Sequence, residues 1–234
     1  ALSAAKLALG GSRKIAEAGR MMRAFADART KSYHYYQASE IVGDLLVAIR
    51  QYAAAGEYYA RLDKAPWPDY KMRAAVASAR VLLDEGKATE AIEAFDKILA
   101  VNAEGDAAPR QQKAAKVGKA AALVALKKPD DAVKLIDEVI EATDTDAKSE
   151  EAPLAARAYN VLGAAHRQAG RTQEALLAFL HVDLLYPNVP DAHAEALANL
   201  AGLWEQVHKA ERASRARQTL KDQYPESPWT KKSP

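Results

Sequence analysis

The stretch AGRTQEALLAFLHVDLLYP, residues 169–187, has the residue types of a helix that follows a tight turn and ends before a proline. Gly170 is its second residue, Ala175 and Phe179 lie one helical turn apart, and Pro187 is its last residue. Glycine is common where two helices are joined by a tight turn, and proline cannot continue a helix. The stretch therefore predicts a helix that is bounded on both sides.

The same spacing recurs along the chain. A second small residue, Gly163, stands twelve residues before Ala175, and comparable pairs of small residues occur in four other segments. The alanines that anchor these five copies, and a weaker copy at the start, are Ala18, Ala55, Ala91, Ala132, Ala175 and Ala213. They are spaced 37, 36, 41, 43 and 38 residues apart, and apolar residues recur between them at helical steps of three and four. The pattern predicts an all-α chain of repeated helix pairs.

The residue types have a physical reason within each pair. We expect Gly163 and Ala175 to meet where the two helices cross, because small side chains let helices approach closely. Phe179, one turn later, would then fill the gap to the next pair. We place the tight turns of the pairs at residues 53–57, 84–87, 126–130 and 168–171, and longer polar loops at 102–112 and 143–153.

Over residues 33–228 the chain resembles a tetratricopeptide repeat protein, on the residues Tyr159, Leu162, Gly163, Ala175, Phe179 and Pro187 and on the anchors of the other copies. The resemblance implies a right-handed α-solenoid of antiparallel helix pairs. In that arrangement residues 1–32 form an N-terminal helical pair, a degenerate repeat, and residues 229–234 form a C-terminal tail. Arg217 stands at the usual aromatic position of the last repeat, and a charged outer face suits a terminal repeat.

The last two repeats have a second resemblance. The segments LLYPNVP (184–190) and LWEQVHKAERASRARQTLKDQYPESPW (203–229) are similar to repeats of bacterial envelope proteins of the outer-membrane assembly lipoprotein and Tol-Pal-associated type. This resemblance implies a bacterial protein that is exported to the periplasm; the alternative is the cytoplasm. Because the chain begins with Ala1, we also expect sequence upstream of it, either a removed signal or a neighbouring domain.

Composition and motifs exclude several classes of function. The net charge of +2 gives no global field that would attract nucleic acid, and the absence of cysteine excludes thiolate metal sites and disulfides. No apolar run reaches the roughly 20 residues of a transmembrane helix. Phosphate-loop, dinucleotide and nucleophile-elbow motifs are absent, and no two histidines have metal-ligand spacing. We therefore predict no enzyme activity, no cofactor and no metal.

The class of function that remains is recognition of another protein. The first helices of the pairs would line a concave groove, where arginines surround a small apolar floor. The predicted groove residues are Arg73, Arg80, Val117, Val124, Arg157, Asn160, Arg167 and Asn199. The arginines either hold a carboxylate of a ligand by bidentate hydrogen bonds or pair internally with Glu40, Asp44 and Glu205.

The predicted function is thus a non-catalytic scaffold that binds a peptide or protein segment in its groove. The alternative is a structural or oligomerising module of a larger assembly, as a monomer or a homodimer. Its mark would be an exposed apolar patch around Trp67, Trp204 or Trp229.

Overall fold

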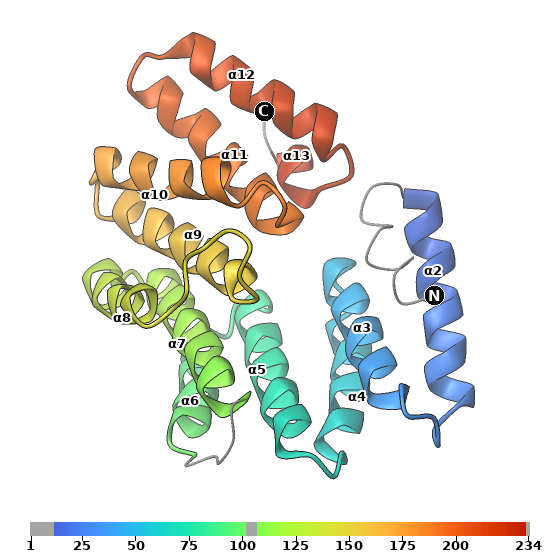
Figure 1. Ribbon diagram of the computed structural model, residues 1–234. Coiled ribbons are helices and arrows are strands. Elements are labelled where there is room, and N and C mark those ends of the chain that lie inside the picture. The colour runs from blue at the N-terminus through green and yellow to red at the C-terminus, as the bar shows by residue number, and fades with distance from the viewer. Residues whose placement is uncertain (1–11, 102–106, 233–234) are drawn as a thin grey trace. The chain divides into compact units, whose positions relative to one another are not determined.

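The computed structural model describes residues 12–101 and 107–232, and these residues form twelve helices and no strand. In chain order the helices are α2 (Ser12–Ala28), α3 (Tyr35–Ala48), α4 (Tyr52–Asp63), α5 (Pro68–Asp84), α6 (Ala88–Leu99), α7 (Ala107–Ala125), α8 (Pro129–Glu141), α9 (Ala152–Gln168), α10 (Thr172–Leu185), α11 (Pro190–Gln206), α12 (Ala210–Gln223) and α13 (Pro228–Lys232). From α2 to α6 in the first part of the chain, and from α8 to α12 in the second, successive helices pack against one another as antiparallel neighbours (Figure 1). The predicted fold class, all-α with the helix pairs of a tetratricopeptide solenoid, is confirmed.

The chain divides into two compact units, and the boundary falls within α7. Unit 1 comprises residues 1–122 and unit 2 comprises residues 123–234. Each unit has its own buried core, so each is described by itself. The domain boundaries expected from the repeats, at residues 32 and 228, stay predictions.

The tight turns of the five pairs share one backbone conformation. Each contains a single residue with positive φ, between 58° and 83°, and each of these residues lies five positions before the anchoring alanine: Arg50, Gly86, Lys127, Gly170 and His208. The next residue donates its N–H to a carbonyl five residues back, at 2.8 or 2.9 Å, which is the bond that closes a Schellman motif. The turn therefore has the same position relative to the anchoring alanine in all five copies.

Two of the expected loops are corrected by the structure. Residues 53–57 lie within α4, and the first turn is centred instead on Arg50. We expected the turn at Gly56 because glycine favours a left-handed backbone, but in this copy the residue with that conformation is Arg50. Residues 107–112 of the expected loop 102–112 are the first turns of α7, and residues 102–106 lie outside the described residues. The loop expected at 143–153 ends where α9 begins, at Ala152.

The close approach within a pair is between a glycine and an aromatic ring. A Cβ added to Gly163 would stand 2.8 Å from two ring atoms of Phe179, whose side chain is fully buried. Gly43 stands against the Tyr59 ring in the same way. We expected Gly163 to meet Ala175, but its three nearest atoms all belong to Phe179. The small residue therefore makes room for the aromatic residue of its own pair.

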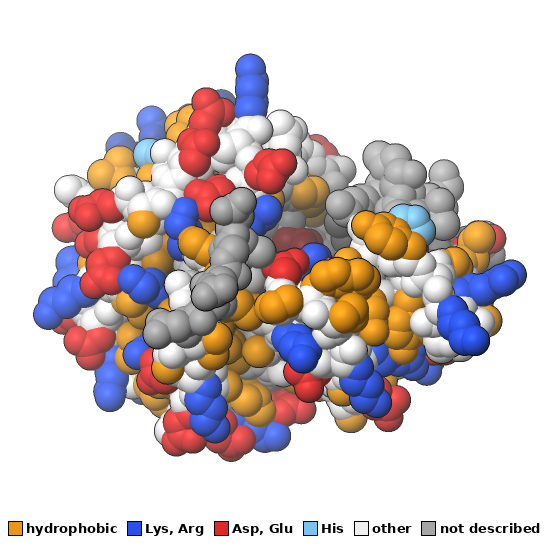
Figure 2. All heavy atoms as spheres, turned by 60° about the horizontal axis from the view of Figure 1, so that its bottom comes forward, with side chains coloured by type: hydrophobic (Ala, Val, Ile, Leu, Met, Phe, Trp, Pro, Cys, Tyr) orange, Lys and Arg blue, Asp and Glu red, His pale blue; other side chains and the backbone are white. Residues whose placement is uncertain are grey.

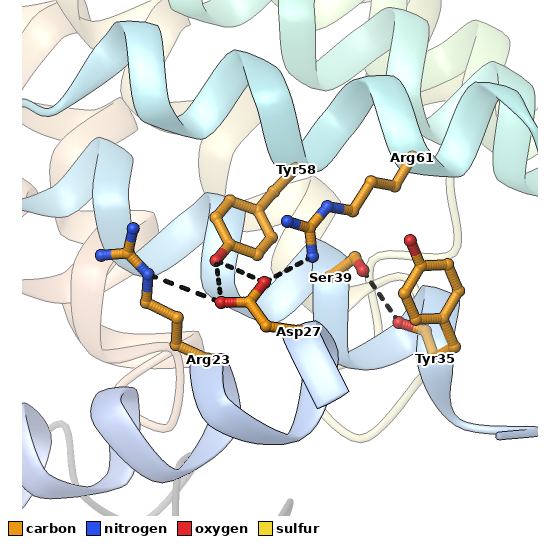
Figure 3. Close-up of polar contacts among 6 residues, drawn as sticks. All are labelled: Arg23, Asp27, Tyr35, Ser39, Tyr58 and Arg61. Atoms are coloured by element: carbon orange, nitrogen blue, oxygen red, sulfur yellow. Dashed lines mark hydrogen bonds and ion pairs between the residues drawn. The ribbon is translucent and has the colours of Figure 1, made fainter. Parts of the chain in front are cut away.

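The N-terminal helix α2 is held on the first pair by a carboxylate. Asp27 accepts hydrogen bonds from the Tyr58 hydroxyl at 3.0 and 3.2 Å and from Arg61 Nη1 at 2.9 Å, and Arg23 approaches it at 3.9 Å (Figure 3). The Arg61 guanidinium also covers the Tyr58 ring at 3.9 Å. A second helix in residues 1–32 was predicted, and residues 1–11 lie outside the described residues.

Candidate functional site

The predicted groove residues are divided between the two units, and all of them lie on the first helices of pairs. Unit 1 contains Arg73 and Arg80 on α5 and Val117 on α7. Unit 2 contains Val124 at the end of α7, Arg157, Asn160 and Arg167 on α9, and Asn199 on α11.

In unit 1, Arg73 is compensated internally. It forms a bidentate pair with Glu40, in which Nε lies 2.8 Å from Oε1 and Nη2 contacts Oε2. Asp69 lies 3.6 Å from its Nη1, and the Tyr70 ring lies under the guanidinium at 5.1 Å. Burial raises the pKa of the Glu40 carboxyl above 4.5, although Arg73 acts in the opposite direction. Since its donors already serve carboxylates, Arg73 is a poor candidate for binding a ligand.

The other two unit 1 residues differ from Arg73. Arg80 is exposed and forms no ion pair within the described part of the chain, and its charge acts on the nearby Tyr59 hydroxyl. Tyr59 donates a hydrogen bond to Asp44 Oδ1 at 2.8 Å, and burial raises the pKa of Tyr59. Val117 is only 6% exposed, so it contributes to the core of the unit and presents little surface to a ligand.

In unit 2, Arg167 is held by a neutral amide. Its Nη1 donates to Asn199 Oδ1 at 2.6 Å, while Asn199 Nδ2 donates to the Glu195 carbonyl at 2.9 Å. Both ends of the Asn199 amide are thus fixed, because a rotated amide would direct its NH₂ group at the guanidinium. No carboxylate among residues 12–101 and 107–232 forms an ion pair with Arg167, which is itself exposed.

Of the remaining unit 2 residues, Asn160 supports the contact between α9 and α11. Asn160, 1% exposed, donates from Nδ2 to the Ala192 carbonyl at 2.9 Å and to Glu195 Oε2 at 3.2 Å. Its role is therefore to join the two helices. Arg157 is exposed and has an interaction partner, and Val124 is half-buried.

Gly202 lies one helical turn beyond Asn199 on the same face of α11. It is exposed, and a Cβ added there would meet nothing within 4 Å. Glycine within a helix is less favourable than alanine by about 0.5–1 kcal/mol. Because packing does not require a glycine here, the open backbone is free to be approached closely by a ligand. We call the residues Ala164, Arg167, Asn199 and Gly202 the α9–α11 surface.

An aromatic patch lies elsewhere, in unit 1. Trp67, 46% exposed, contacts the rings of Tyr36 and Tyr70, with centroids 5.9 and 5.8 Å apart. Figure 2 shows hydrophobic side chains gathered where the ends of α3, α4 and α5 meet. Of the three tryptophans, Trp67 alone has a large exposed area, since Trp204 and Trp229 pack against the core of unit 2.

The sequence interpretation missed one buried cluster in unit 2. His193 Nε2 lies 2.8 Å from Asp183 Oδ1, and His193 Nδ1 lies 2.7 Å from the Tyr224 hydroxyl. Burial raises the pKa of Tyr224, which opposes formation of a nucleophilic phenolate. The cluster therefore ties together α10, α11 and α12. Its members are separated by 10 and 31 residues, and no local motif connects them.

The described residues contain no group that could hold a metal ion and no helix that could cross a membrane. Among them, no group of three histidine, aspartate or glutamate side chains could hold a metal ion. In the same part of the chain no helix has the length and apolar character needed to span a bilayer.

Comparison with known proteins agrees with the repeat architecture. Residues 112–182 match the family model described as tetratricopeptide repeat. A thermophilic TPR protein of Thermus thermophilus has 18% sequence identity, covers 82% of this chain and 92% of its own, and has a TM-score of 0.63. MamA from Desulfovibrio magneticus RS-1 has 16% identity, with 80% and 93% coverage and a TM-score of 0.49.

A third similar structure is YrrB, described as a TPR protein with an unusual peptide-binding site. Its identity is 18%, the coverage is 89% of this chain and 96% of its own, and the TM-score is 0.45. A comparison with curated protein sequences finds no match. The family match over residues 112–182 and the likeness to the Thermus thermophilus structure support a fold of tetratricopeptide-type helix pairs.

Proposed function

We propose that this chain is a non-catalytic interaction scaffold and that the α9–α11 surface binds a peptide or protein segment through a carboxylate. The observation that carries the proposal is the state of Arg167. Its guanidinium is oriented by Asn199 at 2.6 Å, is exposed, and has no compensating carboxylate in the described ranges. A guanidinium presents five donors, so several remain available for a ligand oxygen pair.

The neighbouring residues suit a peptide ligand. Asn199 holds the guanidinium in one orientation, which lowers the entropy lost on binding. Gly202 and the half-buried Ala164 leave space for a ligand backbone beside the charge. The same arrangement lacks a nucleophile with a base in hydrogen-bond reach, so recognition explains it better than catalysis.

The proposal is tested with peptides selected by display against residues 1–234. We expect selected peptides to contain an acidic side chain or a free C-terminal carboxylate. A hydrogen bond to a charged group contributes about 1.5–3 kcal/mol, so Arg167→Ala should weaken binding about tenfold or more. Arg167→Lys should restore little of the lost affinity, because lysine lacks the planar fork.

The matched control is Arg215→Ala, which removes an exposed arginine from the same unit without touching the α9–α11 surface. Equal loss of affinity in both variants would indicate a general charge effect. The proposal would be contradicted if the selected peptides bound the Arg167→Ala variant with unchanged affinity. It would also be contradicted if peptides with an amidated C-terminus and no acidic side chain bound equally well.

We also propose the periplasm as the location, on the resemblance of residues 184–190 and 203–229 to envelope repeat proteins. Fractionation of the native cells, with an antibody against the chain, tests it. Recovery in the cytoplasmic fraction would remove this proposal and leave the binding proposal intact.

A further inference from the structure

The outer face of α10 differs from that of every other second helix. Counted from each anchoring alanine, the second, sixth and ninth following residues are exposed or half-exposed in all five pairs. In α10 these residues are Leu177, His181 and Leu184. In the other four pairs they are polar or small, namely Glu57, Arg61, Lys64, Glu93, Lys97, Ala100, Lys134, Glu138, Glu141, Arg215, Thr219 and Asp222.

Leu177 and Leu184 of α10 lie outside the core of unit 2, whereas Leu176 belongs to it and Leu180 packs against it. Leu177 is 66% exposed and Leu184 is 72% exposed, whereas Ala175, Phe179 and Val182 already fill the inner face of the helix. The half-buried Leu180 and the exposed His181, which stacks on Tyr159 at 4.2 Å, lie between the two leucines. We call Leu177, Leu180, His181 and Leu184 the α10 stripe.

The residues of the α10 stripe share one face of the helix. Single exposed apolar residues are ordinary, but the two exposed leucines, the half-buried Leu180 and the imidazole of His181 follow the i, i+3, i+4, i+7 spacing of one helix face. Large exposed apolar residues rimmed by polar ones mark sites of association. The four equivalent helices show that the fold itself does not require leucine at these positions.

We propose that the α10 stripe pairs with the α10 stripe of a second copy of this chain, with the two helices antiparallel. The spacing reads identically in both directions, so a two-fold axis places Leu177 of one copy opposite Leu184 of the other. It also places Leu180 opposite His181. A self-complementary patch is what an isologous dimer requires.

Charge on the same helix favours this direction. Glu174 is exposed in the first turn of α10. In a parallel pair the two Glu174 carboxylates would face each other, which is unfavourable. In the antiparallel pair Glu174 lies opposite the uncharged Pro187, and the two carboxylates are at opposite ends.

The dimer should be reversible. Standard interfaces bury roughly 800 Å² per partner, and four side chains cannot cover such an area alone. Self-association therefore appears at high protein concentration. The inference concerns the second helices and does not depend on the α9–α11 surface.

Sedimentation equilibrium of residues 1–234, from micromolar to near-millimolar concentration, tests the inference. We expect a monomer–dimer equilibrium, and Leu177→Glu or Leu184→Glu should each raise the dissociation constant about tenfold or more. Thr219→Glu adds the same charge to the equivalent outer face of α12 and should leave the equilibrium unchanged. Circular dichroism confirms that each variant keeps its helices.

Engineered disulfides test the direction in which the two helices pair, and the chain has no native cysteine that would interfere. A mixture of Leu177→Cys and Leu184→Cys chains should form a disulfide-linked heterodimer on mild oxidation, while Leu177→Cys alone should remain reduced. Efficient linkage of Leu177→Cys to itself would overturn the antiparallel pairing.

Three results would overturn the proposal of a second copy. The first is a monomer at every concentration, and the second is a dimer that Leu177→Glu and Leu184→Glu leave intact. The third is a monomer that binds phosphatidylcholine–phosphatidylglycerol vesicles through the α10 stripe, with binding abolished by Leu177→Glu or Leu184→Glu.

Discussion

Replacing Gly163 by alanine tests the packing that sets the distance between the helices of a pair. The added Cβ would stand 2.8 Å from two ring atoms of Phe179 and 2.9 Å from a third. Contacts this short force a shift, and the Phe179 ring is fully buried, where protein interiors are close-packed. Gly202→Ala is the matched control, because it adds the same methyl group to a glycine of the same unit with nothing within 4 Å.

The magnitude follows from two terms. Alanine is favoured over glycine within a helix by about 1 kcal/mol at either position. Overpacking a well-filled core costs about 1–3 kcal/mol, and this term applies at Gly163 alone. We therefore expect Gly202→Ala to raise the free energy of unfolding by about 1 kcal/mol. The free energy of unfolding of the Gly163→Ala variant should be about 1–3 kcal/mol lower than that of the Gly202→Ala variant, because only the first variant is overpacked.

Equilibrium urea unfolding, followed by tryptophan fluorescence, provides the measurement. Trp204 and Trp229 report on unit 2, and a Trp67→Phe background removes the signal of unit 1. Phe179→Leu should relieve much of the penalty of Gly163→Ala, so a double-mutant cycle should show favourable coupling. If Gly163→Ala were as stabilising as Gly202→Ala, the close approach of glycine and ring would be refuted.

Further predictions concern substitutions at four single residues. Lys127 has φ 59°, a left-handed conformation that is unfavourable for a residue with a Cβ, so Lys127→Gly should stabilise unit 2 by about 1 kcal/mol. Gly170 has φ 75°, so Gly170→Ala should destabilise unit 2 by a similar amount. Urea unfolding measures both changes. Burial and Arg171 lower the pKa of His166 below 6.5, so the unfolded state binds protons more readily and stability should fall as the pH drops through about 6.5. His166→Phe should flatten that part of the stability–pH curve, and an unchanged slope would contradict the reasoning. Asp27→Asn should speed amide hydrogen exchange in α2 and leave α9 unchanged, because Tyr58 and Arg61 lose a charged acceptor.

Much of the fold could be predicted from the sequence because each pair repeats one set of local constraints. The anchoring alanines Ala55, Ala91, Ala132, Ala175 and Ala213 are all fully buried. The turns at Gly86 and Gly170 were predicted from their glycines. The turn at Lys127 was predicted from the neighbouring Pro129, but the turn at Arg50 was not, because neither a glycine nor a proline stands next to Arg50.

The candidate site was less predictable. Helical spacing placed Arg167 and Asn199 on first helices, but their hydrogen bond depends on how α9 and α11 pack. Spacing also could not separate Arg73, which is paired with Glu40, from Arg167, which is not paired with a carboxylate in the described residues. The α10 stripe was hidden for a related reason, since a leucine at helical spacing is usually part of the core.

The central claim is that the α9–α11 surface binds a carboxylate-containing peptide, and it is tested most directly by NMR titration of the isotope-labelled chain with a display-selected peptide. We predict that the largest shift changes occur at the Arg167 side chain and the Gly202 amide, and that the change at the Gly202 amide disappears with an Arg167→Ala chain. Shift changes confined to other helices, or unaltered by that substitution, would contradict the claim.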